Sequence, residues 1–211
     1  GVDLSEKINP ISRRQILSSI GQIKLINTYD QFFQEVDLIC AQVLVTQGDF
    51  RDRTHYLNMQ NCINSLLDND VIPIINENDT VSITELMFTD NDALAGMVCS
   101  LIGADKLIIL SNVDGVFTGN PDDKASRLIE KVNAITEVEN HISLNRSSFG
   151  RGGMLTKATM ALKMADLGVE VYIANGTKKN VLIDLVTDNA RCTFFPAKRK
   201  IDSTRKWIAS S

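Results

Sequence analysis

The apolar positions along the chain form two kinds of run, short stretches rich in branched side chains and longer stretches with helical spacing. The helical spacing predicts helices over residues 12–36, 52–67, 93–103, 154–167 and 180–186. The short branched runs predict strands over residues 38–46, 71–75, 106–111, 169–174 and 192–195. Polar segments separate these elements, among them a predicted turn at residues 47–49 and a long loop at residues 76–92.

Strands that alternate with helices of ten or more residues must pair in parallel, because tight hairpins cannot join parallel neighbours. The pattern therefore predicts an α/β protein, a three-layer sandwich with a mainly parallel central sheet. Pro73 within the second predicted strand is typical of an edge or a bulge. Residues 1–10 contain no initiator Met and no capped element, which indicates a sequence that begins partway into a longer protein.

The amino-acid composition limits the kinds of partner and location that are expected for this chain. The chain has 211 residues, 44% of them hydrophobic and 23% charged, which is typical of one globular domain. A net charge of −4 argues against nucleic acid as a partner and favours a small molecule. No run approaches the length of a membrane-spanning helix and no signal peptide opens the chain, so we expect no membrane association and a cytoplasmic location.

The cysteines and histidines suggest no metal centre. Four cysteines are scattered without paired spacing and lie in apolar or amphipathic stretches, which predicts reduced core thiols: Cys40, Cys62, Cys99 and Cys192. His55 and His141 lack a spacing typical of catalysis, so we assign both to structure or surface. The basic stretch at residues 198–206 is interpreted as a solvated tail or linker.

The loop after the second predicted strand is the first candidate site. Its residues Asn76, Glu77, Asn78 and Asp79 combine amides with carboxylates, and this mix suits an ammonium beside a carboxylate. Ligands of open α/β sheets bind beyond the carboxyl ends of strands, which favours the functional interpretation. A plain turn built from Asn and Asp explains the motif alone at least as well.

The residues Asp90, Asn91 and Asp92 form a second candidate at the predicted start of a helix. Asp and Asn are preferred helix N-caps, so capping explains one of the three. Capping does not need all three side chains. The surplus of polar groups in the same loop system therefore favours a site.

A glycine-rich turn at residues 150–157 is the third candidate, because it leads into a helix with Thr156 and Lys157 in its first turn. Glycine allows close backbone approach to a phosphate, the helix start supplies free N–H groups, and Lys supplies a cation. The motif is not a Walker A sequence. A glycine turn with a solvated Lys is the alternative, and the combination of glycines, Thr and Lys makes it the weaker one.

Four strings in this order resemble the amino-acid kinase family, and within it the glutamate 5-kinases: INENDTV (75–81), TDND (89–92), GADKLIILSNVDGVFTGNP (103–121) and FGRGGMLTK (149–157). The likeness extends to RKWI at residues 205–208. It implies the amino-acid kinase fold, with the first strand and phosphate loop expected before residue 1. The implied domains are a kinase domain over residues 1–197 and a tail over 198–211, which in this family often leads to an RNA-binding-like PUA domain.

The resemblance also implies roles for particular residues. Asn76, Asp79 and Asn91 match glutamate-binding positions, Asp92 matches the acidic residue that organises the catalytic lysines, and Lys157 matches the lysine that stabilises the transferred phosphoryl group. The implied ATP-binding positions are Ser111, Asn112, Gly152, Gly153, Met154, Thr156 and Lys157. Asn112 stands where the family usually carries Asp, and no metal-ligating residue is implied.

The activity implied by the resemblance is ATP-dependent phosphorylation of the side-chain carboxylate of L-glutamate to γ-glutamyl phosphate, the first step of proline biosynthesis. It further implies Mg²⁺, feedback inhibition by proline and a homo-oligomer, either a dimer or a tetramer. A glutamate side chain, with a pKa of about 4.3, is ionised at neutral pH, so catalysis needs electrostatic stabilisation and no general base. Alternatives are a family member acting on aspartate, acetylglutamate, carbamate or a nucleotide, or a non-catalytic ligand-binding remnant.

Overall fold

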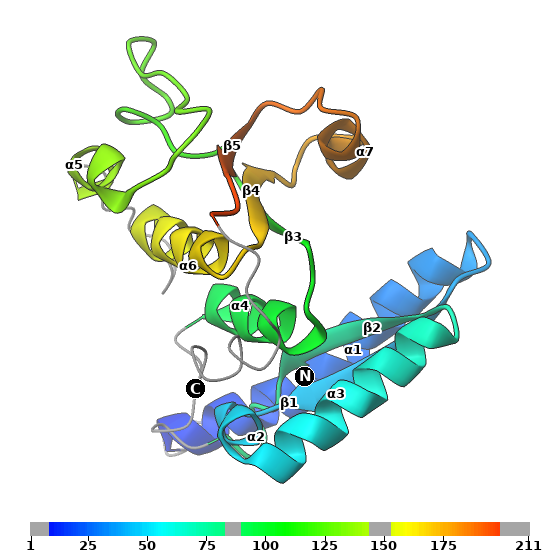
Figure 1. Ribbon diagram of the computed structural model, residues 1–211. Coiled ribbons are helices and arrows are strands. Elements are labelled where there is room, and N and C mark those ends of the chain that lie inside the picture. The colour runs from blue at the N-terminus through cyan, green and yellow to red at the C-terminus, as the bar shows by residue number, and fades with distance from the viewer. Residues whose placement is uncertain (1–8, 83–89, 144–152, 199–211) are drawn as a thin grey trace. The chain divides into compact units, whose positions relative to one another are not determined.

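The computed structural model describes residues 9–82, 90–143 and 153–198 of the chain. The chain divides into two compact units, unit 1 (residues 1–91) and unit 2 (residues 92–211), and each is described by itself (Figure 1). Within the described ranges, no helix combines the length and the apolar character needed to cross a bilayer.

Unit 1 contains a two-stranded parallel sheet of β1 (Ile39–Val45) and β2 (Val71–Glu77). The strands are joined through α2 (Gln47–Arg51) and α3 (Arg53–Asp68), the crossover that the sequence pattern predicts. Pro73 lies opposite Ala41 in this sheet. The predicted strands and the long crossover helix are confirmed, and β2 extends two residues beyond its predicted end.

A turn was predicted at residues 47–49, and this prediction is wrong because the segment forms the short helix α2. The carboxylate of Asp49 accepts hydrogen bonds from both the backbone N–H and the hydroxyl of Thr46, at 2.6 and 2.8 Å. An acidic side chain that folds back on the residue before a helix satisfies a free donor of the first turn. This local capping stabilises a helix that hydrophobic spacing does not reveal.

The first helix, α1 (Pro10–Gln34), lies behind the sheet in Figure 1, and α3 lies in front of it. Asn9 caps α1 by accepting the N–H of Ile11 at 2.9 Å, and Pro10 follows at the first helical position. None of the α1 residues is fully buried within the described chain. Its apolar side chains include Ile23 and Phe32, each 63% exposed.

Unit 2 contains a three-stranded sheet in the order β3 (Lys106–Ser111), β4 (Glu170–Asn175) and β5 (Cys192–Phe195). The first pair is parallel and β5 is antiparallel to β4. The helices are α4 (Asn91–Ile102), η2 (Ile135–Glu137), α5 (Glu139–Ser143), α6 (Met154–Asp166) and α7 (Val181–Val186). The first residue of α4 closes unit 1, and the two short elements η2 and α5 were not predicted.

The alternation of side chains along β4 gives unit 2 its layers. Val171 and Ile173 pack in the main core with the buried residues of α6, whereas Ala174 packs on the other side with Val181 and Leu185 of α7. Successive strand residues point to opposite faces, so both faces of this sheet are covered by helices. The predicted three-layer α/β arrangement is thus present in unit 2.

The predicted fold class is confirmed, with parallel pairing in both units, and the described strands form one sheet in each unit. All four cysteines are free thiols, as predicted. Their placement in the core is correct for Cys99, which is buried, and wrong for Cys62, which is exposed on α3. Cys62 lies on a helix that buries only Tyr56 and Ile63 fully, so most of its positions face outward.

Candidate active site

The starts of α4 and α6 are joined by an ion pair in unit 2. Lys157 Nζ donates to Asp92 Oδ2 at 2.5 Å, although the two residues are 65 positions apart in the chain. One helical turn further along, a Cβ atom at Gly96 would overlap Met160 Sδ, so a larger residue there would require the Met160 side chain to move. At the next turn Ser100 Oγ lies 3.8 Å from Met164 Sδ.

These contacts recur at helical spacing, at residues 92, 96 and 100 of α4 and at 157, 160 and 164 of α6. Residues three and four apart share one face of a helix, so one face of α4 contacts one face of α6 at these three points. The packing of the two helices therefore fixes the ion pair at their N-terminal ends. Asp92 and Lys157 are only 14% and 19% exposed, and this partial burial strengthens their attraction relative to a surface pair.

The predicted phosphate-binding segment forms the beginning of α6. Gly153 is the N-cap, and Met154, Thr156 and Lys157 lie in the first turn. A helix N-terminus presents free N–H groups and a partial positive charge, so it binds anions. A Cβ atom at Gly153 would meet no heavy atom within 4 Å among the described residues, which leaves room for a ligand beside this turn. Gly152 lies outside the described residues.

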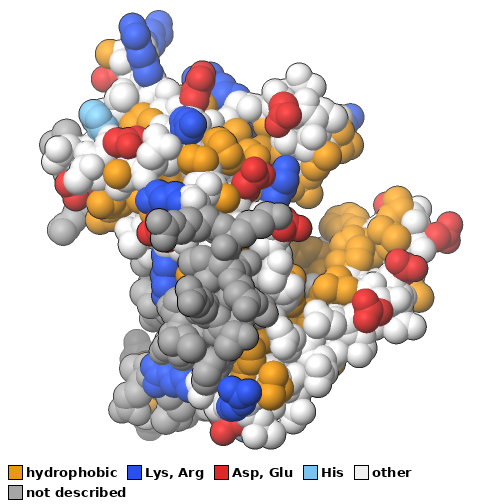
Figure 2. Space-filling view, viewed as in Figure 1, with side chains coloured by type: hydrophobic (Ala, Val, Ile, Leu, Met, Phe, Trp, Pro, Cys, Tyr) orange, Lys and Arg blue, Asp and Glu red, His pale blue; other side chains and the backbone are white. Residues whose placement is uncertain are grey.

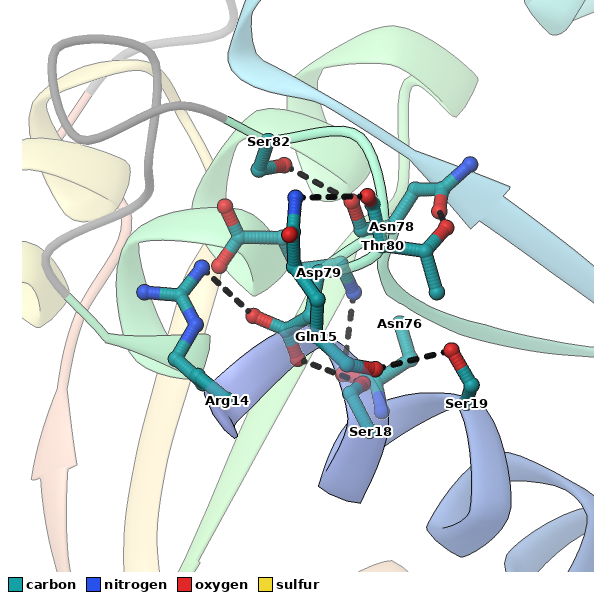
Figure 3. Close-up of polar contacts among 10 residues, drawn as sticks. Arg14, Gln15, Ser18, Ser19, Asn76, Asn78, Asp79, Thr80 and Ser82 are labelled. Atoms are coloured by element: carbon teal, nitrogen blue, oxygen red, sulfur yellow. Dashed lines mark hydrogen bonds and ion pairs between the residues drawn. The ribbon is translucent and has the colours of Figure 1, made fainter. Parts of the chain in front are cut away.

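The acidic residue Asp79 is held by α1 in unit 1 (Figure 3). Its Oδ1 atom pairs with Arg14 Nη2 at 3.0 Å, and its Oδ2 atom accepts a hydrogen bond from Ser18 Oγ at 3.2 Å. Gln15 Nε2 donates to the Thr80 carbonyl at 2.9 Å. The first turns of α1 thus fix both Asp79 and the backbone that follows it.

The loop around Asp79 is also held from within. Asn78 N donates to the Val45 carbonyl at 2.7 Å, which extends the contact between β1 and β2 by one residue. The Asn78 carbonyl accepts from the backbone N–H and the hydroxyl of Ser82, and Asn78 Oδ1 accepts from Thr80 Oγ1 (Figure 3). Asn76 was predicted in the loop, but it lies in β2 opposite Leu44. The position is still the carboxyl end of a parallel strand.

A third group of polar side chains follows β3 and β4. Ser111 ends β3, its hydroxyl lies 3.4 Å from Asn112 Oδ1, and its carbonyl accepts the N–H of Gly176 after β4. Two residues beyond Asn112, the buried Asp114 pairs with Lys178 Nζ at 2.7 Å and with Arg191 Nε at 3.6 Å. The residues that follow the two parallel strands are thereby linked.

The carboxyl group of Asp114 is ionised well into the acid range. Burial alone would raise its pKa, but hydrogen bonds from Lys178 and Asn175 outweigh burial and hold the pKa below the ordinary value of 3.8. The same loop contains Gly115, where an added Cβ atom would overlap Thr193 Oγ1 of β5. This loop is therefore fixed to the sheet by charge and by close packing.

The structure brings the predicted residues together in three groups. Asp92 lies against Lys157 at the start of α6, Asn76 precedes Asp79 at the end of β2, and Ser111 adjoins Asn112 at the end of β3. Asn91 is the exposed first residue of α4, directly before Asp92.

Two groups of side chains that hold a carboxylate in place were not predicted from the sequence. Arg14 and Ser18 hold Asp79, and their spacing of four residues on a helix places them on one face. That spacing indicates a shared helix face, but it does not identify Asp79 as the partner. Lys178 and Arg191 carried no signal, because only the folded sheet brings them to Asp114.

Comparison with known proteins identifies the family of this chain. Residues 3–175 match the family model described as "Amino acid kinase family". The glutamate 5-kinase of Bacteroides thetaiotaomicron is 48% identical over 209 residues, which cover 98% of this chain and 58% of that protein. The glutamate 5-kinase of Chlorobaculum tepidum is 46% identical over 211 residues, which cover 100% of this chain and 58% of that protein.

The fold also matches that of a solved structure. Carbamate kinase from Giardia lamblia bound to AMP-PNP superposes with a TM-score of 0.63 at 14% sequence identity, covering 93% of this chain and 75% of that one. At this identity the likeness shows the fold alone. The chain spans a little under three fifths of the length of the two glutamate 5-kinases, 58% of each. The chain belongs to the amino acid kinase family, and within that family its sequence resembles the glutamate 5-kinases.

Proposed function

We propose that the protein containing this chain transfers the γ-phosphoryl group of ATP to the side-chain carboxylate of L-glutamate, forming γ-glutamyl phosphate in the first step of proline biosynthesis. The observation that carries this proposal is the Asp92–Lys157 ion pair at the paired starts of α4 and α6. It supplies a fixed cation beside a helix N-terminus in a chain whose relatives are named glutamate 5-kinases.

The chemistry follows from the charge of the acceptor. The carboxylate oxygen of glutamate attacks the γ-phosphorus, the bond between this phosphorus and the bridging oxygen breaks, and ADP leaves. The acceptor is already ionised at neutral pH, so no side chain has to remove a proton. Lys157 stabilises charge on the migrating phosphoryl group, and Asp92 positions its ammonium.

Nucleotide binding is assigned to the segment that opens α6 and to the end of β3. We assign ATP contacts to Ser111, Asn112, Gly152, Gly153, Met154 and Thr156, together with Lys157. The free N–H groups of the first turn of α6 support phosphate binding there, and the open space beside Gly153 supports a close approach. Asn112 can both donate and accept hydrogen bonds, so it can contact a nucleotide without the negative charge of Asp.

Mg²⁺ is proposed to bind together with ATP. The residues that the structure describes contain no cluster of three or more His, Cys, Asp or Glu side chains that could hold a metal ion. Mg²⁺ commonly keeps several waters and binds together with the phosphates of its substrate, so it does not need a cluster of protein ligands. When bound, the ion would offset the charge of the β- and γ-phosphates.

Amino-acid binding is assigned to Asn76, Asp79 and Asn91. Asp79 is an acceptor for an ammonium group, and the two amides can serve either a carboxylate or an ammonium. The fixed position of Asp79, with a donor on each of its oxygens, supports this role because the carboxylate is preorganised before a ligand arrives.

Further proposals concern regulation, assembly and location. We propose that proline inhibits the enzyme, that the enzyme is cytoplasmic, and that it forms a dimer or a tetramer. Figure 2 shows hydrophobic side chains at the surface of unit 1, and Ile23, Phe32 and Ile39 are each more than 60% exposed in the described chain. Large exposed apolar patches are typical of interaction surfaces, which supports assembly. We also propose residues 1–197 as the kinase domain and 198–211 as a tail.

The test is a substrate panel with the full-length protein. ATP and Mg²⁺ are supplied with L-glutamate, aspartate, acetylglutamate, carbamate or UMP, and ADP release is measured. Hydroxylamine traps the acyl phosphate as a hydroxamate. We expect ADP and hydroxamate with L-glutamate far above the other acceptors. Greater ADP release with another acceptor would identify that acceptor as the substrate in place of glutamate. The absence of turnover with every acceptor would support a ligand-binding remnant.

A further inference from the structure

A pair of opposite charges lies in the part of unit 1 that is proposed to bind the amino acid. The basic residue of this pair has no function assigned in the proposal above. Arg14 Nη2 lies 3.0 Å from Asp79 Oδ1 (Figure 3). The two side chains are 32% and 27% exposed, so a solute can reach both. A donor and an acceptor thus stand side by side at the carboxyl end of β2, where ligands of α/β sheets bind.

The surrounding contacts fix the pair. Arg14, Gln15 and Ser18 are on two successive turns of α1, and all three contact the segment 79–80. Ser18 holds the second oxygen of Asp79, so the carboxylate cannot rotate freely. An ionised carboxylate has about four lone-pair positions, so Asp79 can still accept a hydrogen bond from a ligand while both contacts persist.

The chemistry of the pair matches the head group of an α-amino acid. That group carries an ammonium and a carboxylate on one carbon, so it is recognised by an acceptor and a donor held close together. A guanidinium has five N–H donors in a planar fork that fits a carboxylate, so Arg14 is the type of residue that recognises an α-carboxylate. Asp79 alone would attract the ammonium and repel the α-carboxylate.

We propose that Arg14 is a specificity-determining residue, whose guanidinium binds the α-carboxylate of the substrate while Asp79 binds its α-ammonium. This inference deepens the proposed function and rests on it for the identity of the amino acid. The pair selects a substrate that carries both head-group charges. It discriminates against glutarate, which lacks the ammonium, and against 4-aminobutyrate, which lacks the α-carboxylate.

The test compares three variants of the full-length protein with three ligands. The variants are Arg14→Met, Arg14→Lys and the control Arg13→Met, which removes the neighbouring, exposed arginine of the same helix. The ligands are L-glutamate, glutarate and 4-aminobutyrate, measured by steady-state kinetics and by calorimetric binding. Thermal unfolding confirms that each variant is folded, and Arg14→Lys retains a positive charge if Arg14→Met does not fold.

We expect Arg14→Met to raise KM and Kd for L-glutamate by about 10- to 10²-fold, the loss expected for a hydrogen bond to a charged group, with kcat changed much less. The same variant should weaken 4-aminobutyrate much less than L-glutamate, because 4-aminobutyrate has no α-carboxylate and loses only the support that Arg14 gives to Asp79. The KM and Kd of Arg14→Lys for L-glutamate should lie between those of the wild type and those of Arg14→Met, since an ammonium does not replace the planar fork. Arg13→Met should behave like the wild type.

Two outcomes would overturn the inference. Equal weakening of L-glutamate and 4-aminobutyrate by Arg14→Met would mean that Arg14 only holds the loop, and an unchanged glutamate KM would mean that it has no role in binding. Failure of the proposed function is distinguishable. A wild-type protein that binds L-glutamate in an Arg14-dependent way but does not phosphorylate it would retain the inference and refute the kinase reaction.

Discussion

The ion pair of unit 1 and the ion pair of unit 2 join similar groups in different surroundings. Arg14 and Asp79 are 32% and 27% exposed, whereas Lys157 and Asp92 are 19% and 14% exposed. Charges near water are screened and exchange partners easily, while less exposed charges keep their partners. The comparison suggests that the first pair binds a charged ligand and that the second holds a cation in place.

The two pairs are also held by different means. Hydrogen bonds from α1 position Asp79 in a loop, whereas helix packing through Gly96 positions Asp92 and Lys157. Hydrogen bonds fix a loop only at the residues that they join, while packed helices resist movement along their contact. A catalytic ammonium needs the second kind of support, because transition-state stabilisation depends on preorganised charge.

The largest effect is expected from the removal of Lys157. Loss of one electrostatic donor to a transition state costs about 10²- to 10³-fold in turnover, so we expect Lys157→Ala to lower kcat by this factor with smaller changes in the binding of either substrate. Steady-state kinetics of the full-length protein measure kcat and the KM for each substrate. Lys157→Arg should rescue poorly, because a planar fork does not replace a compact ammonium.

Near-normal turnover in a folded Lys157→Ala protein would refute the phosphate-site assignment. The control is Lys163→Ala, which removes another lysine of α6, located in its last turn. This control should retain full turnover. A comparable loss in the control would mean that the effect belongs to the helix rather than to the ion pair.

Asp92→Asn should lower turnover by about 10- to 10²-fold, because the ammonium of Lys157 would lose a charged hydrogen-bond partner. The loss should be similar across the pH range, since an ionised acceptor needs no general base. A pH–rate profile measures this. The disappearance of an acidic limb in the variant would indicate general-base chemistry by Asp92 instead.

Asp79→Ala should mainly affect the amino acid. Loss of a charged hydrogen bond to the ammonium predicts a rise of about 10-fold or more in the KM for glutamate, with the KM for ATP changed far less. Steady-state kinetics with each substrate varied in turn test this. Equal effects on both substrates in a folded variant would contradict the division of roles between the two pairs.

The sequence predicted most of this fold because its signals are local. The branched run 106–111 and the apolar spacing of 154–167 match β3 and α6 within one residue. The short helix α2 was missed because its stability comes from the Asp49 cap rather than from a buried stripe. The exposed position of Cys62 was missed because hydrophobic context does not show which face of a helix is covered.

The candidate site could be predicted only in part. Asp92 and Lys157 were each readable from a polar helix start and a glycine-rich turn, and the family resemblance assigned their roles. Their contact could not be predicted, because only the fold brings Gly96 of α4 against Met160 of α6 and the two helix starts together. Arg14 was not identified, because its spacing from Ser18 indicates only a shared helix face, and the fold alone brings Asp79, 65 residues away, to that face.

The two ion pairs should differ by a small but measurable amount in their coupling energy, which is the contribution of each pair to the free energy of unfolding. Exposed ion pairs contribute about 0–1 kcal/mol, so we expect the Arg14–Asp79 coupling energy to lie in this range and that of Asp92–Lys157 to exceed it. Double-mutant cycles by chemical denaturation measure both. Equal coupling energies would remove the contrast in environment on which the comparison rests.

Asp114 is expected to contribute to folding stability without contributing to glutamate binding, so it is a control for the two ion pairs. Its pKa lies below the ordinary value of 3.8 in the folded protein, so its carboxylate stabilises the fold above this pH, and the stabilisation is lost as the pH falls through the lowered pKa. Asp114→Asn should therefore reduce stability at neutral pH, and the difference from the wild type should shrink below about pH 4. The KM for glutamate should stay unchanged. Unfolding at several pH values measures the effect, and a difference that grows in acid would contradict it.

The most direct test of this division of roles is the calorimetric affinity of the full-length protein for L-glutamate, measured without turnover in the Lys157→Ala and Asp79→Ala variants. The account predicts that Lys157→Ala binds glutamate with an affinity close to that of the wild type, whereas Asp79→Ala binds it at least about 10-fold more weakly. Weak binding by Lys157→Ala together with unchanged binding by Asp79→Ala would contradict it.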